Sequence, residues 1–243
     1  MDETGKNLSV VMISLNEEGS IERVVKDIRR VVPDAEIVLV DSSTDRTAEI
    51  ATELGCNVFK QFPPQGYGNA LHKAFELASR DFVVTMDCDS TYPVDAIPKL
   101  RQIMADQNAD IVSASRLPKR PDTMPMANYI ANVGFCWLGL LVCGIWTTDL
   151  HTGMRLYKKR VLRDYPYDPS YGALPVELQL GPMMCGYKCV ETYIDYHERE
   201  GVSKLQKWVG TVTTLQRIWH CRWGLNPFRS QQVKAQREKR AYN

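Results

Sequence analysis

Short apolar runs that alternate with helical stretches set the strongest limit on how this chain folds. Five such runs lie in its first half, and several are rich in Val and Ile: 8–15, 36–40, 57–61, 82–86 and 111–114. Between them, apolar residues recur at helical spacing, in the stretches 21–28, 47–54, 69–78 and 97–107. Strands that alternate with helices predict βαβ units and a mostly parallel sheet flanked by helices. The fold class expected is therefore α/β.

Polar clusters follow four of these predicted strands, at the point where each strand ends. They are Asn16-Glu17, the segment 41–45, the segment 87–89 and Ser115-Arg116. Right-handed crossovers bring the carboxyl ends of parallel strands to one edge of the sheet. Ligands of open α/β sheets bind beyond that edge. The sequence therefore predicts one binding site built from four separate segments.

The second half of the chain is less regular, but it continues the same pattern. It contains predicted helices at 128–145, 176–185 and 208–223, and a predicted late strand at 188–196. The segment from Arg229 to Asn243 is polar, and we expect a tail there. We predict one domain over residues 1–228, followed by the tail 229–243.

Composition excludes several classes of protein. The net charge of +1 on 243 residues gives no global attraction to nucleic acid, so no nucleic-acid partner is expected. The seven cysteines form no CxxC pair, which favours reduced, buried thiols in a cytoplasmic protein. The polar start is not a signal peptide. The longest apolar stretch, Val133 to Trp146, is shorter than the roughly 20 residues that span a bilayer, so no transmembrane helix is expected.

Asp87 and Asp89 flank one residue directly after a predicted strand. Two carboxylates so spaced can reach one divalent cation, and oxygen ligands suit Mg²⁺ or Mn²⁺. A DxD pair alone is more often two solvated carboxylates in a turn, but its place in the edge cluster favours a metal and diphosphate site. Asp41 can accept hydrogen bonds from a base and Glu17 from a ribose, although an Asx turn that caps the next helix explains the segment 41–45 equally well. The chain has no GxGxxG and no GxxxxGK[ST] motif.

Several ordered motifs resemble those of the family-two inverting glycosyltransferases. VVMISLNEE resembles their "VVIPTYNEE", VDSSTDRTAEIA their "VDDGSTDGT" loop, and GYGNALHKAFELASRDFVVTMDCDSTYP their segment around DxD. SASR and DLHTGMRLYKK are similar to the later "GSR" and "DFHSGFRAYRR". The resemblance runs from about Leu8 to about Lys204, and is closest to the dolichyl- and polyprenyl-phosphate mannose or glucose synthases. It implies a GT-A fold, a nucleotide-sugar donor and a metal ion.

Carried over by motif position, the resemblance also implies residue roles. Donor contacts would come from Ser14, Asn16, Glu17, Asp41 and Asp87, with Arg199 and Lys204 closing over the donor. Asp87 and Asp89 would hold the metal. The residues expected at the reacting centre are Asp89, Arg155 and Asp149, and those expected near the acceptor or its phosphate are Arg116, His151 and Glu177. An Arg suits phosphate because its planar fork binds two oxygens.

The acceptor stays open at this point. A phosphate acceptor is already anionic, whereas a hydroxyl acceptor requires a carboxylate base, for which Asp149 and Glu177 are the candidates. The related synthases usually carry a basic residue after "GSR", but the segment 124–148 has no Lys or Arg; Lys119 and Arg120 are possible substitutes. We therefore keep three interpretations: hexose transfer to a polyprenyl phosphate, transfer to a soluble acceptor, or a non-catalytic sugar-nucleotide binder.

The late helix 208–223 has two interpretations as well. Its Trp and apolar residues fit a core helix that packs on the sheet. With Arg217 and Arg222, they also fit a face that contacts the cytoplasmic surface of a membrane. The oligomeric state is left open.

Overall fold

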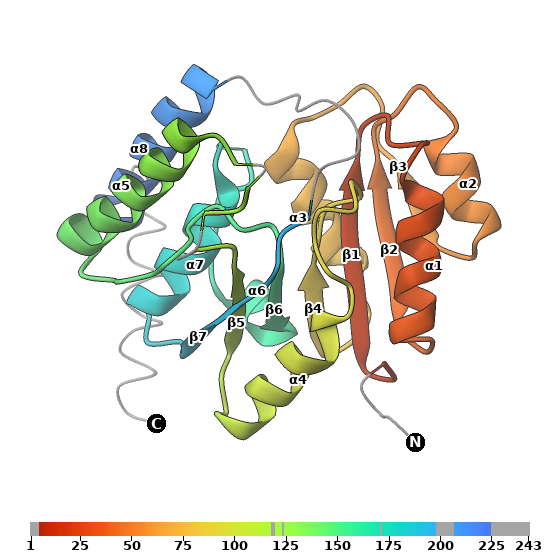
Figure 1. Ribbon diagram of the computed structural model, residues 1–243, viewed down its shortest axis with the longest axis horizontal. Helices are drawn as coiled ribbons and strands as arrows, with labels where there is room; N and C mark the ends of the chain where they lie inside the picture. The colour runs from red at the N-terminus through yellow and green to blue at the C-terminus, as the bar shows by residue number, and fades with distance from the viewer. Residues whose placement is uncertain (1–4, 118–119, 123, 171, 198–206, 225–243) are drawn as a thin grey trace.

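The computed structural model describes residues 5–117, 120–122, 124–170, 172–197 and 207–224, without the side chains of 207–209. A seven-stranded sheet forms its centre, in the order β3-β2-β1-β4-β6-β5-β7 (Figure 1). The strands are β1 (Leu8–Ser14), β2 (Glu36–Asp41), β3 (Asn57–Lys60), β4 (Phe82–Thr85), β5 (Ile111–Ser115), β6 (Arg155–Lys158) and β7 (Cys189–Tyr193). Every neighbouring pair is parallel except the two that β6 makes with β4 and β5.

Helices connect these strands and cover both faces of the sheet. They are α1 (Ile21–Val31), α2 (Thr47–Glu53), α3 (Tyr67–Leu77), α4 (Ala96–Asp106), α5 (Met126–Cys143), α6 (Lys159–Asp164), α7 (Leu174–Met184) and α8 (Lys207–Trp223). The predicted α/β class and the mostly parallel sheet are confirmed. The sequence pattern missed only β6 and α6. Both are short, and no turn residue such as Gly, Pro, Asn or Asp separates them.

The core is divided by the sheet because neighbouring residues of a strand point to opposite faces. Val10 and Met12 of β1 pack with α1 and α4, whereas Val11 of the same strand packs with α3 on the other face. A third cluster joins α5, α7 and α8 beside the sheet, through residues such as Cys136, Leu180 and Ile218. The prediction of one domain over 1–228 stays a prediction, and the tail 229–243 lies outside the described residues.

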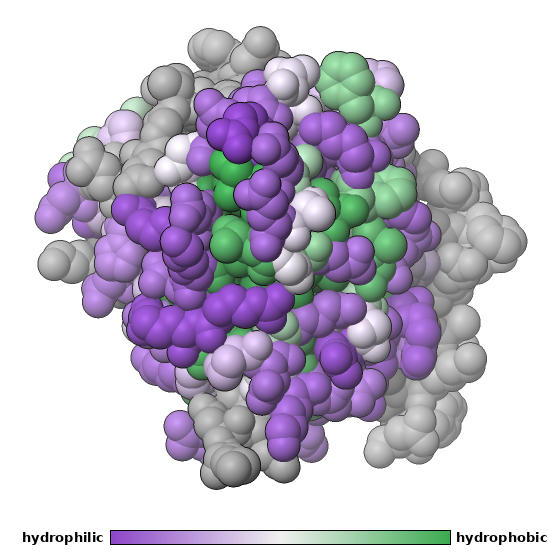
Figure 2. Space-filling view, turned by 90° about the vertical axis from the view of Figure 1, so that its right-hand side faces the viewer, coloured by the Kyte–Doolittle hydropathy of each residue, from purple (hydrophilic) through white to green (hydrophobic). Residues whose placement is uncertain are grey.

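The two flanks of the molecule differ in character. Figure 2 shows the flank at the right of Figure 1, where α1 and α2 lie, and its surface is mainly hydrophilic with apolar residues showing between polar ones. On the opposite flank α5 and α8 lie side by side. All seven cysteines are free thiols, and four of them are buried.

One of the described helices, α5, is long and apolar enough to cross a membrane by length and composition alone, and little of it is buried. This corrects the expectation that no such helix exists. The sequence prediction takes the apolar stretch to begin at Val133. The helix begins at Met126, because the weakly apolar residues before Val133 are also helical. A left-handed residue, Gly144, ends it.

Candidate active site

The polar clusters predicted from the sequence do meet at one edge of the sheet. The parallel strands β1, β2, β4 and β5 end there. Strand β6 runs the other way, so its first residue, Arg155, pairs with Thr85 near the end of β4. The loop that precedes β6 therefore reaches the same edge. This is why the segments around Asp87 and Gly153, far apart in the chain, lie in contact.

The nucleoside side of this edge is centred on Asp41, the last residue of β2, which is fully buried. The hydroxyl of Ser14 donates to its Oδ1 at 2.6 Å, and the hydroxyl of Ser43 donates to the same atom. Lys60, at the end of β3, donates from Nζ to Oδ2 at 2.5 Å. Asp41 is thus held in place by its two neighbouring strands and its own loop. Its predicted contact with a base stays a prediction.

Asn16 and Glu17 form the turn after β1 and hold the next loop. Asn16 has a left-handed backbone, with φ of 54°, which Asn tolerates better than most residues. Its side-chain oxygen accepts from the backbone N–H of Thr44 at 2.8 Å, and the backbone N–H of Glu17 donates to the Thr47 hydroxyl at 2.9 Å. The expected Asx turn is present, since Asp45 accepts from the backbone N–H of Thr47 at 3.0 Å, but the N-cap of α2 is Arg46, which makes no side-chain cap hydrogen bond.

The DxD turn follows β4 directly. Asp89 is 3% exposed, and its Oδ1 accepts from the hydroxyl of Thr91 at 2.6 Å. Asp87 is partly exposed. Ser20, at the start of α1, donates from its hydroxyl to the carbonyl of Cys88 at 2.6 Å. The turn is therefore anchored to α1 through the residue between the two carboxylates.

Gly153 brings the DxD turn against the loop before β6. A Cβ on this residue would lie 3.0 and 3.2 Å from the two carboxylate oxygens of Asp87 and 3.2 Å from the Tyr92 hydroxyl. The backbone N–H of Gly153 donates to that hydroxyl at 2.6 Å, and its carbonyl accepts from the Thr85 hydroxyl at 2.7 Å. Only a residue without a side chain fits here without displacing Asp87.

The donor set at this turn fits a hard divalent cation. Two carboxylates supply oxygen ligands, and within the described residues no group of three or more His, Cys, Asp or Glu gathers around a common point. Mg²⁺ binds in this manner, through one or two carboxylates together with phosphate oxygens of a ligand. Asp87 and Asp89 therefore suit a cation that completes its coordination on a bound diphosphate.

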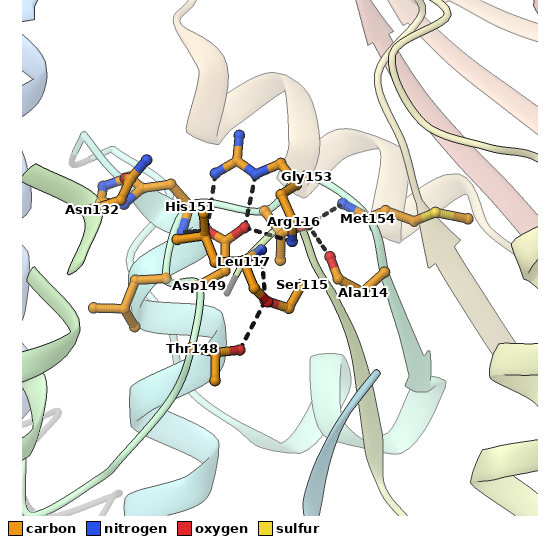
Figure 3. Close-up of polar contacts among 12 residues, drawn as sticks. Ala114, Ser115, Arg116, Leu117, Asn132, Thr148, Asp149, His151, Gly153 and Met154 are labelled. Carbon is orange, nitrogen blue, oxygen red and sulfur yellow. Dashed lines mark hydrogen bonds and ion pairs between the residues drawn. The ribbon is translucent and has the colours of Figure 1, made fainter. Parts of the chain in front are cut away.

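Arg116 and Asp149 form a two-pronged ion pair beside the DxD turn (Figure 3). Nε of Arg116 lies 2.7 Å from one carboxylate oxygen of Asp149 and Nη2 lies 2.9 Å from the other. Burial alone would raise the pKa of Asp149, but the guanidinium outweighs it and lowers that pKa below its ordinary value. Asp149 is thus ionised, and it orients Arg116. Its predicted catalytic role and the predicted acceptor contact of Arg116 stay predictions.

Arg155 lies deeper than its predicted role requires. It is 1% exposed, and its guanidinium donates to the Ser113 hydroxyl at 3.2 Å, the Leu150 carbonyl at 3.0 Å and the Pro175 carbonyl at 2.5 Å. These bonds tie the loop before β6 to the start of α7. The predicted contact of Arg155 with phosphate stays a prediction, and in this structure the side chain supports the walls of the site.

His151 and Glu177 connect the site to α8. His151 Nε2 lies 2.9 Å from the Thr214 hydroxyl, and burial lowers its pKa to about 4. Glu177 is fully buried and forms an ion pair with Arg217, which also donates to the Gly172 carbonyl at 2.8 Å. Both predicted acceptor-side residues thus touch the inner face of one helix, and their roles toward an acceptor stay predictions.

Sequence reasoning missed several residues that shape this site. Lys60, Tyr92 and Gly153 are given no role by the sequence, because their partners lie far away in the chain and no local pattern marks them. Arg217 is expected, in one interpretation of the late helix, on a face that contacts a membrane, and this expectation is wrong, because its side chain is fully buried and pairs with Glu177. The closeness of Gly153 to DxD follows only from the antiparallel β6. Arg199, Lys204 and Lys119 lie outside the described residues. Arg120 donates to the Met124 carbonyl at 2.6 Å.

A model of the glycosyl transferase family 2 matches residues 9–166, which include the nucleoside side, the DxD turn and the loop before β6. The chain belongs to glycosyl transferase family 2. The matched range therefore contains the segments that the structure assembles at the edge of the sheet.

Two curated relatives of this transferase come from Haloferax volcanii. One is a dolichyl-phosphate hexose transferase, 41% identical over 208 residues, which covers 85% of this chain and 90% of the relative. The other is the low-salt glycan biosynthesis hexosyltransferase Agl6, 32% identical over 82% of this chain and half of its own length. The transferase is thus an enzyme of the hexosyltransferase kind.

Solved structures with the same fold include glucosyl-3-phosphoglycerate synthase from Mycobacterium tuberculosis in complex with Mn²⁺, UDP and phosphoglyceric acid. It superposes with a TM-score of 0.68 and 22% identity, covering 89% of this chain and 80% of the synthase. At this identity the likeness concerns the fold, and the transferase has the GT-A fold expected from its motifs. Divalent metal ions are bound in such neighbours.

Proposed function

We propose that this transferase moves a hexose, with inversion, from a UDP- or GDP-sugar to a polyprenyl phosphate of the dolichyl type. The observation that carries the acceptor is the ion pair of Arg116 with Asp149. Together with the 41% identity to a dolichyl-phosphate hexose transferase, it favours an acceptor that is already anionic.

The two carboxylates considered as general bases are both engaged. Asp149 is clamped by Arg116, which lowers its pKa, and Glu177 is buried against Arg217. A base works best when its pKa is close to the working pH, so a carboxylate held ionised by an arginine is a poor proton acceptor. A phosphate monoester needs no such help, because it is an anion at neutral pH.

In the proposed reaction an oxygen of the acceptor phosphate attacks the anomeric carbon. The bond from that carbon to the nucleoside diphosphate breaks, and the diphosphate leaves with the bonding electron pair. Ser14, Asn16, Glu17 and Asp41 would hold the nucleoside, and Arg116, oriented by Asp149, would face the acceptor phosphate. Asp87 and Asp89 would hold a Mg²⁺ or Mn²⁺ ion, which would offset the charge of the diphosphate.

A soluble phosphorylated acceptor is the second candidate. The segment 124–148 carries no Lys or Arg, and the synthase of the same fold is named for a phosphoglycerate product.

A cytoplasmic location, peripheral on the membrane, is part of the proposal of a lipid acceptor.

Calorimetric titration with UDP and with GDP, each with and without Mn²⁺, tests the donor side. We expect one nucleotide to bind only when the metal is present. This metal-dependent binding should be lost in Asp89→Ala. Transfer assays with the matching nucleotide-hexose then compare a polyprenyl phosphate in detergent with 3-phosphoglycerate. Transfer to phosphoglycerate alone would replace the lipid acceptor with a soluble one. Binding of neither nucleotide would favour a non-catalytic protein or an unusual donor.

A further inference from the structure

The outer faces of α5 and α8 each carry an apolar stripe, and the two helices lie side by side on the flank opposite α2. On α5 the exposed stripe contains Ile130, Trp137 and Leu141, which are 62%, 53% and 79% exposed. On α8 it contains Leu215, Trp219 and Trp223, which are 44% to 56% exposed. Residues three, four or seven apart share one face of a helix, so each set lies along one face, with Gly134 between Ile130 and Trp137 on α5. Water-exposed patches of this composition mark interaction sites.

The inner faces of the same helices belong to the protein. Gly139 of α5 packs against Leu180 of α7 and Leu150, and the Cys143 thiol lies 3.7 Å from the Ile218 carbonyl of α8. A helix that crossed a bilayer would have to give up these contacts. Helix α5 is long enough to span a bilayer, but these contacts hold it along the flank of the domain, beside α8 (Figure 1).

The sequences of these two helices carry charge of one sign. The segment 124–148 contains no charged residue, and the segment 205–237 contains no Asp or Glu. Arg222 is exposed at the end of α8, beside the ring of Trp223. The segment 225–243 follows directly and adds five Lys or Arg against one Glu, in a chain whose total charge is only +1. Helix α8 and the sequence that follows it thus carry an excess of basic residues.

We propose that the outer faces of α5 and α8 form a surface that docks in the plane of an anionic lipid bilayer. Apolar side chains and Trp rings enter the interface between headgroups and acyl chains, while Lys and Arg bind the anionic headgroups. This inference deepens the proposed function and rests on it only for the lipid acceptor. On its inner side, α8 contacts His151 through Thr214. His151 is one of the residues expected near the acceptor, so docking through α8 would bring the phosphate of a lipid acceptor to that side of the site.

Intrinsic fluorescence tests the surface directly, because all five Trp of the chain lie between positions 137 and 223, in or beside these two helices. The full chain is mixed with vesicles of phosphatidylcholine alone, or with added phosphatidylglycerol. We expect a blue shift of the emission and quenching by brominated lipid, with the anionic vesicles and far less with the neutral ones. Absence of both signals, with no sedimentation of the chain with anionic vesicles, would overturn the inference.

Paired variants locate the contact. We expect Trp137→Ser with Leu141→Ser, and separately Leu215→Ser with Trp219→Ser, to reduce the vesicle-bound fraction about tenfold or more each. Phe62→Ser, at a site 61% exposed and on another part of the surface, is the matched control and should bind as the parent does. Equal binding by all variants would overturn the assignment of the surface.

Two further measurements separate this inference from the proposed function. The vesicles contain no polyprenyl phosphate, so failure to bind them contradicts the surface without touching the acceptor. Transfer to polyprenyl phosphate in detergent reports the acceptor without a bilayer. Light scattering of the chain in solution gives the remaining outcome: a dimer that dissociates in the Trp137 and Leu141 variant would show that a second copy covers this surface.

Discussion

The donor half and the acceptor half of the site are stabilised in different ways. The donor half, at the ends of β1, β2 and β4, is held by short polar side chains and backbone groups, as in the bonds from Ser14 to Asp41 and from Thr91 to Asp89. The acceptor half, beside β5 and β6, is held by buried arginines: Arg116 on Asp149, Arg155 on backbone carbonyls and Arg217 on Glu177. One half depends on hydroxyl and backbone hydrogen bonds between neighbouring strand ends, and the other on buried guanidinium groups.

This difference decides how each half should respond to change. Short hydroxyl and backbone hydrogen bonds are each worth about 1 kcal/mol. A buried ion pair that loses one partner leaves an uncompensated charge, which costs several times more. The acceptor half is therefore the more fragile one toward substitution of a charged residue.

The largest effect should come from the metal carboxylates of the donor half. Asp89→Ala removes a ligand from a cation that offsets several kcal/mol of charge, so kcat/KM for hexosyl transfer should fall about a thousandfold or more. Thermal unfolding should stay near that of the parent. Asp95→Ala, at an exposed carboxylate that pairs with Arg30, is the control and should keep its activity.

Next in size, the buried pair of the acceptor half should dominate stability. Arg217→Met leaves Glu177 buried and unpaired, so the free energy of unfolding should drop by about 3–5 kcal/mol in urea titrations. Adding Glu177→Leu should recover part of the loss, because it removes the stranded charge. If the single and double variants were equally stable, the pair would not be the support that distinguishes this half.

The contact between the halves is tested at Gly153. A methyl group at Gly153→Ala would lie 3.0 to 3.2 Å from the Asp87 carboxylate and the Tyr92 hydroxyl, so these groups must shift by a few tenths of an ångström. A displacement of about 1 Å near a reacting centre can cost about a hundredfold in rate, so we expect this smaller shift to lower kcat by about three- to tenfold, with a weaker metal dependence of nucleotide binding. Gly134→Ala, where nothing lies within 4 Å of the added carbon, should be silent.

The pH dependence of stability should reflect His151 of the acceptor half. Its pKa is lowered to about 4 in the folded state, from an ordinary value of 6.5, so the unfolded chain binds the proton more readily. Stability is therefore complete above about pH 6.5 and decreases as the pH falls toward 4, by about 2 kcal/mol at pH 5. His151→Gln should flatten this decrease. His220, whose pKa burial also lowers, adds to the slope that remains.

The smallest effect should come from the ion pair of the donor half. Lys60 is 45% exposed, and Asp41 keeps the hydroxyls of Ser14 and Ser43 when the lysine is removed. Lys60→Met should therefore change the free energy of unfolding by less than about 1 kcal/mol. A loss as large as that of Arg217→Met would erase the distinction between the two halves.

The two halves also differ in how much of them could be predicted from the sequence. Strands β1 to β5 and the helices between them, with Asp41 and the DxD turn, follow from local periodicity and from short motifs with a known meaning. The resemblance also located the loop before β6. The pairing of Arg217 with Glu177 and the inward position of Arg155 could not be predicted, since both depend on which distant segments the antiparallel strand and α8 bring together.

The reversal of β6 has a consequence for how this enzyme can diversify. Because β5 and β6 are adjacent and antiparallel, with Ser113 opposite Arg155, the whole segment 116–154 is in topological terms the loop of a hairpin. Such a loop can lengthen, shorten or change its helix while the register of the sheet stays pinned at its two ends. Recombination within 116–154 offers a route to exchange one acceptor for another on an unchanged donor framework.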